Sequence, residues 1–369
     1  MYRRFAWRVK GILSVNAAMH LLPFAALGHA AMMMHDLTHN DDCELDGPLL
    51  FGRVLDGRGG AREISWEAAR AWKPSVPGEM LWVHLCRTEP GAREWLMEHC
   101  AISAPTAQLL TSDATRPRAF REDGALVATL RGINFNPGAE PEDMVSMQVW
   151  CDGTRLVTLR RAPLQTPRDT RDELDAGQGP VDAGSLITSL TKHLVGRMGN
   201  VILDLDDAID ALEEQEVDCA DKAMLAEISR IRRECLQLKR YMSPQHEALE
   251  NISRDAPEWF EPHDRREIAE TIDRLRRYLD DLDITTESAL VLQDDVRARL
   301  LERNARTQSQ LAIVATIFLP LNFIAGLLGM NVEGLPDAKD PAAFWEVLAI
   351  CAGITVVQLL IFKKLRWSD

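Results

Sequence analysis

Two long apolar segments near the C-terminal end dominate the pattern of hydrophobic and polar residues in this chain. Leu311–Leu328 and Phe344–Phe362 contain 18 and 19 nearly uncharged residues. At about 1.5 Å per residue, a helix of either length is long enough to cross the hydrocarbon core of a bilayer. The pattern therefore predicts a membrane hairpin, with transmembrane helices over residues 311–330 and 344–363 joined by a short acidic loop.

The first apolar segment contains polar and small residues that a plain lipid anchor does not need. Helical steps of three and four place one set on a single face: Gln308, Leu311, Ala315, Leu319, Asn322, Gly326 and Gly329. An amide in hydrocarbon is costly, so we expect Asn322 to face protein or water. Small residues let helices approach closely. A pore would need several copies of this helix. A two-helix anchor and a dimer interface built from the same residues are the alternatives.

The segment before the first span has a sustained heptad pattern. No Gly or Pro occurs between Asp264 and Leu319. Apolar residues recur in steps of four and three at Ile268, Ile272, Leu275, Leu279 and Leu282, and the pattern continues at Ala289, Val296 and Leu300 with polar interruptions at Thr286 and Gln293. This predicts a long helix packed on other helices, about 100 Å long if it runs into the membrane. It could be a pore-lining stalk or a coiled-coil dimerisation rod.

The first half of the chain has a different pattern. Short strands are predicted at Leu49–Leu55, Leu81–Leu85, Ala125–Ile133, Met144–Trp150 and Leu156–Leu159, with helices at Ser65–Trp72 and Ala92–Cys100. They indicate an α/β domain over residues 47–184, in which Gly57–Gly60 forms a hairpin turn. Pro167–Gly184 is expected to be a linker. A helical region follows over residues 185–310, beginning with one helix from Ser185 to Tyr241 that Pro244 ends.

Charge adds an orientation and excludes one class of partner. The net charge of −14 argues against a nucleic-acid partner. Basic residues flank the hairpin at Arg297, Arg299, Arg303, Arg306, Lys363, Lys364 and Arg366, whereas the loop over residues 331–343 carries Glu333, Asp337 and Asp340 against Lys339 alone. Positive residues stay on the cytoplasmic side, which puts both termini, including the tail 364–369, in the cytoplasm. The loop acids either attract cations or form an ordinary solvated outer loop.

Other candidate chemistry is weaker. An acidic run at Asp204, Asp206, Asp207, Asp210, Glu213, Glu214 and Glu216 either binds regulatory cations or is a solvated face, and no individual ligand is assigned. The seven cysteines are scattered, as in a reduced compartment. No nucleophile–base set or phosphate loop indicates an enzyme. Residues 1–33 are expected to be a leader or a mis-assigned start. The polar stretch 34–46, despite His35, His39 and Cys43, is expected to be a disordered tail.

The end of the first span resembles a known family. Ile317–Gly326 followed by Gly329-Met330-Asn331, a short loop and a final span resembles the signature of the CorA superfamily of divalent-cation transporters. Further segments resemble its ZntB-type zinc transporter branch: Leu55–Gly60, Thr115–Arg118, Gly177–Pro180, Tyr241–Gln245 and Gly334–Pro336. The resemblance covers residues 47–369.

The resemblance implies an α+β membrane protein that assembles as a homopentamer. Each subunit would have a cytoplasmic α/β domain and a stalk helix continuous with the first of two transmembrane helices in the bacterial inner membrane. That helix would line the pore, with Asn331 in a selectivity ring and Gly329 and Met330 shaping its turn. Asn322 and Leu319 match pore-lining positions of the family, on the face that also holds Leu311, Ala315 and Gly326.

The resemblance also implies a substrate and no cofactor. Neutral amide oxygens can accept hydrogen bonds from a hydrated dication without holding it too tightly for release. Zinc is the favoured ion. Met330 and Glu333 depart from the zinc branch, which often has Val or Ile before the asparagine and two glycines after it, so magnesium, cobalt or nickel is the alternative. A non-conducting, membrane-anchored coiled-coil scaffold is the alternative from another functional class.

Overall fold

The computed structural model describes residues 47–214, 222–329 and 343–365. The chain divides into two units. The first, the sheet unit, contains the residues up to Met198 together with Arg240–Arg276. The second, the helical unit, contains Gly199–Lys239 and the residues from Arg277 onward.

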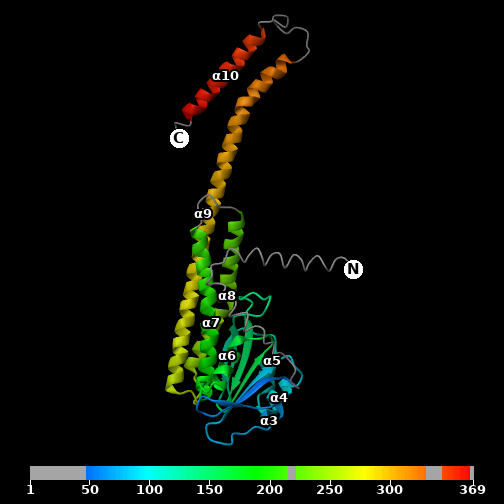
Figure 1. The fold of residues 1–369 in the computed structure, drawn as a ribbon, viewed down its shortest axis with the longest axis vertical. Coiled ribbons are helices and arrows are strands. Elements are labelled where there is room, and N and C mark those ends of the chain that lie inside the picture. The colour runs from blue at the N-terminus through cyan, green and yellow to red at the C-terminus, as the bar shows by residue number, and fades with distance from the viewer. Residues whose placement is uncertain (1–46, 215–221, 330–342, 366–369) are drawn as a thin grey trace, which may run out of the picture. The chain divides into compact units, whose positions relative to one another are not determined.

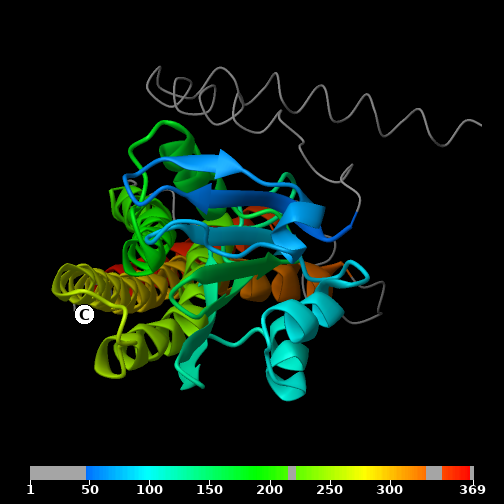
Figure 2. The same ribbon diagram turned by 90° about the horizontal axis from the view of Figure 1, so that it is seen from below.

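A mixed sheet of seven strands forms the centre of the sheet unit (Figure 1). The strands are β1 (Leu49–Leu55), β2 (Ala61–Glu63), β3 (Met80–Cys86), β4 (Arg118–Glu122), β5 (Ala125–Gly132), β6 (Val145–Cys151) and β7 (Arg155–Arg160). They lie side by side in the order β2-β1-β3-β7-β6-β5-β4, from the blue hairpin to the green strands in Figure 2. Only the β3–β7 pair is parallel among the strands described. The five strands expected from the sequence are therefore confirmed.

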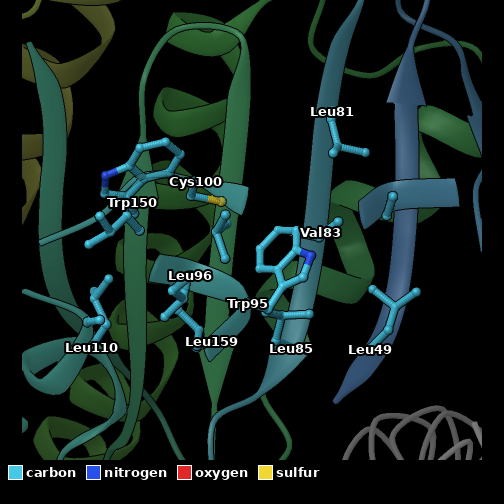
Figure 3. Close-up of a cluster of buried hydrophobic side chains, with 14 of the residues drawn as sticks. Leu49, Leu81, Val83, Leu85, Trp95, Leu96, Cys100, Leu110, Trp150 and Leu159 are labelled. Carbon is cyan, nitrogen blue, oxygen red and sulfur yellow. The ribbon is translucent and has the colours of Figure 1, made fainter. Parts of the chain in front are cut away.

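Helices and an apolar cluster cover one face of this sheet. Three short helices lie between strands in the chain: α3 (Trp66–Arg70), α4 (Ala92–His99) and α5 (Ala104–Thr111). Figure 3 shows Trp95 and Leu96 of α4 and Leu110 of α5 against strand residues such as Val83 and Leu159. Every residue of β3 and β6 is buried, because these inner strands have neighbours on both faces. On the other face of the sheet, Leu164 and Leu194 pack close to β5. A Cβ built on Gly132 would lie 2.9 Å from Leu164 and 3.5 Å from Leu194.

The first hairpin turn has the geometry that its glycines predict. Gly57 and Gly59 have φ values of +71° and +95°, which side chains rarely allow. The Asp56 carboxylate accepts hydrogen bonds from the backbone N–H groups of Arg58 at 2.7 Å and Gly60 at 3.1 Å. The hairpin-turn interpretation of this glycine-rich segment is confirmed.

Three expectations for the helical segments are wrong. Half of the expected linker is helical in α6, which covers Gln165–Asp175 and holds Pro167 in its first turn, where no backbone N–H is needed. Pro244 does not end a helix. It lies inside α8 (Lys222–Arg254), where Met242, Gln245 and Ala248 are buried on either side of it. That packing offsets a proline cost of about 3 kcal/mol.

The remaining helices are α7 (Ala183–Glu213), α9 (Pro262–Leu328) and α10 (Ala343–Leu365). The segment Ser185–Tyr241 is therefore not one helix, since α7 ends at Glu213 and α8 begins at Lys222. The last buried residue of α7 is Leu212. The described residues after it, Glu213 and Glu214, are exposed.

The heptad pattern of α9 is satisfied within the chain itself. Buried residues recur every seven positions at Ile268, Leu275, Leu282, Ala289 and Val296. In the helical unit, Thr285 Oγ1 donates to Asp206 of α7 at 3.1 Å, and Gln293 Nε2 donates to Ser229 of α8 at 3.0 Å. The second seam position is partly misplaced in the sequence pattern. Thr285 is buried in place of the expected Thr286, whereas at the next turn Leu292 and the expected Gln293 are both buried.

Candidate functional site

Two described helices are long and apolar enough to cross a membrane. They are α9, through an 18-residue window in Pro262–Leu328 with mean hydropathy 2.3, and Trp345–Lys364 of α10, with mean hydropathy 2.1. None of either window is buried inside the chain. A core helix of a soluble protein would be mostly buried, so these surfaces need another apolar environment, which a bilayer supplies.

The C-terminal part of α9 and α10 form a hairpin in which α10 covers one face of α9 (Figure 1). The half-buried residues of this part of α9 are Ile313, Ile317, Pro320, Leu321 and Ile324. On α10 the half-buried residues are Val347, Cys351, Ile354, Thr355, Gln358 and Phe362. Both sets recur in steps of three and four, so each helix uses one face for the pairing.

The face of α9 that carries the polar and small residues lies opposite α10. Each residue turns a helix by about 100°, which places the centre of the set Leu311, Ala315, Leu319, Asn322 and Gly326 roughly 180° from the half-buried set. All five residues are exposed, with Leu319 at 74% and Leu311 at 66%. We call this surface the amide face. Its only amide within the span is Asn322.

The amide face can interact with polar groups outside its own chain. The side chain of Asn322 is exposed, so its carbonyl oxygen and NH₂ group are available to water or a hydrated ion. A Cβ on Gly326 would meet no atom within 4 Å, so the packing of its own chain does not require glycine there. A glycine at such a position leaves room for a neighbouring helix to approach.

Gly329, the first residue of the predicted selectivity motif, directly follows the last residue of α9. Gly329 N–H donates to the Ala325 carbonyl at 2.9 Å, which closes the last turn of the helix. A Cβ on Gly329 would lie 3.0 Å from that same carbonyl oxygen, a tight contact. Met330, Asn331, Glu333, Asp337 and Asp340 lie outside the described residues.

Pro320 leaves one backbone carbonyl of the first span without its helical donor. The sequence analysis did not identify the residue that replaces this donor. Proline has no N–H, so the Thr316 carbonyl loses the donor that residue 320 would provide. Gln358 Nε2 of α10 donates to this carbonyl at 3.0 Å. The signal that could have found Gln358 is its amide, a costly group in an otherwise apolar helix.

The other candidate groups do not assemble into a site. Among the residues that the structure describes, no three His, Cys, Asp or Glu side chains are arranged to hold a metal. Burial raises the pKa of Cys100 to about 12, so beside His99 it is a neutral thiol and a poor ligand. The described members of the acidic run are exposed, as expected for a solvated face, and Asp206 also accepts a hydrogen bond from the buried Thr285 of α9.

Comparison with known proteins identifies close relatives of this architecture. Residues 77–364 match the family model described as CorA-like Mg2+ transporter protein. The divalent cation transporter CmaX of Pseudomonas aeruginosa is 38% identical over 322 residues, which cover 86% of this chain and 96% of CmaX. The zinc transport protein ZntB of Pectobacterium carotovorum is 31% identical over 317 residues, covering 85% and 94%. The full-length CmaX structure covers 88% of this chain and 100% of its own, with a TM-score of 0.77 at 36% identity.

Proposed function

The chain belongs to the CorA-like Mg2+ transporter family, and on that premise we propose that it carries divalent cations, with zinc favoured, across the bacterial inner membrane. In this proposal five copies surround one pore. The first span of each copy lines the pore with the amide face, and Asn331 forms a selectivity ring at its outer mouth. The relatives are transporters rather than enzymes, and the ion is cargo, not a resident cofactor.

The observation that carries the proposal is the position of the amide face. Because α10 covers the opposite side of α9, Asn322 is left without cover from its own chain. Exposure of an amide to lipid would be costly. Placing this face around a shared axis puts Asn322 in water and leaves the apolar outer surface of α10 toward lipid. The basic residues flanking the hairpin favour cytoplasmic termini.

Hydrated dications suit such a pore. Magnesium in particular gives up its water reluctantly, and neutral amides can bind the hydration shell weakly enough for the ion to leave. Zinc is favoured by the ZntB relatives at about 30% identity, whereas the family description names Mg2+. The scaffold alternative loses support from the heptad seam, because its buried positions are covered within the chain and do not call for a coiled-coil partner.

The function is tested by ion uptake into proteoliposomes. Asn322→Leu should lower Zn²⁺ uptake about tenfold while the assembly keeps its size, because the polar contact to hydrated ions is lost. Phe323→Leu is the matched control, since it creates the same residue one position later, about 100° around the helix. Equal uptake by both variants and the parent would rule out the amide face as the ion path.

The identity of the ion is tested with the parent chain. Zn²⁺ and Mg²⁺ uptake are compared in the same vesicles, with and without a pH gradient. Zinc uptake exceeding magnesium uptake supports the proposed substrate. Magnesium uptake without zinc uptake would overturn it, and an effect of the gradient would show proton coupling.

A further inference from the structure

The first span is interrupted by Pro320, eight residues before the end of α9. In a regular helix the N–H of residue 320 would donate to the carbonyl of Thr316. Proline cannot donate, and a backbone carbonyl left without a donor in hydrocarbon is costly because no water is present to replace it. The Thr316 hydroxyl does not solve the problem, because it donates to the Ala312 carbonyl at 2.8 Å.

The missing donor comes from α10. Gln358 Nε2 donates to the Thr316 carbonyl at 3.0 Å, across 42 residues of sequence. Gln358 is the only amide side chain in α10. The hydroxyl of Thr355, one turn earlier, makes no such link, since it donates to the Cys351 carbonyl of its own helix at 2.9 Å.

The other end of the Gln358 amide shows that packing alone does not explain this residue. Its Oε1 atom is buried and has no hydrogen-bond partner among the described residues. A buried unsatisfied oxygen is unfavourable, and Leu or Met would fill the same space without it. The amide is therefore useful through its donor, which reaches the carbonyl that the proline leaves open.

We infer that Gln358 is a positioning residue that fixes α10 to the pore-lining helix at the Pro320 break and thereby sets the direction of the segment that carries Asn322 and Gly326. Gln358 lies on the α10 side of α9, opposite the amide face, so it acts through α9 and not on the ion. The inference rests on the proposed function only for its effect on transport. The hydrogen bond and its effect on helix mobility do not depend on it.

A double-mutant cycle between Gln358 and Pro320 tests the inference. Gln358→Met keeps the length of the side chain and removes the donor. In Pro320→Ala, the backbone N–H of residue 320 supplies the donor from within α9, so Gln358 is no longer needed. We expect Gln358→Met to change Zn²⁺ uptake and the amide hydrogen-exchange rates of Leu321–Leu327 by roughly threefold in the parent chain. In the Pro320→Ala chain the same substitution should change them by less than half as much.

Two readouts are measured on the full chain in lipid: Zn²⁺ uptake and the amide hydrogen-exchange rates of Leu321–Leu327. In the parent chain, Gln358→Met should slow uptake and speed exchange. Thr355→Val is the control, because it removes a hydroxyl that bonds only within α10, and it should change neither. Gln358→Asn, which keeps the amide but shortens its reach, should behave like Gln358→Met and replaces it if that variant does not assemble.

The outcomes separate the two claims. An exchange effect that depends on Pro320, in a parent chain without uptake of any divalent ion, would support the link and overturn the transport proposal. Equal effects of Gln358→Met in both backgrounds would show that the side chain only fills space. No effect on exchange in the parent would also overturn the inference.

Discussion

At the scale of single residues, His84 shows how the sheet holds a titratable group away from water. His84 is 2% exposed and stacks on Phe51 with ring centroids 4.9 Å apart. Its Nδ1 lies 2.8 Å from the hydroxyl of Thr158 on the neighbouring strand. Burial, aided by the positive charges of Arg160, Arg168 and Arg171, holds the pKa of His84 well below 6.5. The folded protein therefore contains a neutral imidazole at this position.

This residue makes folding stability depend on pH. In the unfolded chain His84 binds a proton as the pH falls below about 6.5, whereas in the folded chain it does not. The contribution of His84 to the free energy of unfolding is therefore fully present above pH 6.5 and is lost as the pH falls. Between pH 6.5 and 5, the parent should lose up to about 2 kcal/mol more than His84→Met. Unfolding of the full chain, with hydrogen exchange at β3 and β7, measures this. Parallel pH profiles for the two proteins would contradict it.

A second residue-scale prediction concerns the β6–β7 turn. Gly153 has a φ of +93°, and a Cβ there would lie 2.7 Å from the Trp259 ring. Gly153→Ala should therefore lower the free energy of unfolding by about 1–3 kcal/mol. Gly138→Ala is the control for backbone strain alone, since Gly138 has a φ of +80° but open space around it. A loss no larger than that of the control would show that Trp259 moves aside freely.

At the scale of elements, the seven-residue seam of α9 is the clearest link between pattern and packing. Leu282 is fully buried, whereas Ile284, two residues later, is 61% exposed. Leu282→Ala should lower the free energy of unfolding by about 2–4 kcal/mol because it leaves a cavity. Ile284→Ala should change it by no more than about 0.5 kcal/mol. A large loss from Ile284→Ala in the assembled protein would show instead that another copy covers this residue.

Packing explains which elements the sequence predicted and which it did not. The inner strands are runs of apolar residues, so their pattern is visible without their neighbours. The edge strand β4 has Ala119 as its only buried residue, and its pairing with β5 depends on a turn rather than on alternation. Pro244 was expected to stop a helix because proline propensity is local, whereas the burial of Met242 and Gln245 that retains the helix is not.

The candidate site was predictable to a similar extent. Helical spacing alone grouped Leu319, Asn322 and Gly326 on one face, and the structure leaves that face exposed. The partner of Thr316 could not be predicted, because the pairing with Gln358 depends on the register of α10 against α9. Spacing within one helix carries no information about that register.

At the scale of the whole molecule, the proposed assembly makes a prediction about neighbouring copies. Leu319 lies on the amide face, whereas Ile317 lies on the side that α10 covers. If the amide faces surround one axis, oxidation of Leu319→Cys in lipid should link chains covalently well above the level of the parent. Ile317→Cys, in a chain that also carries Cys351→Ser, should not. Gel electrophoresis without reductant measures this, and equal linking of both variants would contradict the arrangement.

The division of the chain into units has a consequence for its synthesis. Strand β3 gains its parallel neighbour only when β7 has been made. The sheet unit also includes Arg240–Arg276, which the ribosome makes after Gly199–Lys239 of the helical unit. The apolar end of α9 follows soon after Arg276 in the same helix. All of the sheet unit is nevertheless made before Leu311, so its last segment is available for folding when the ribosome reaches the first apolar span.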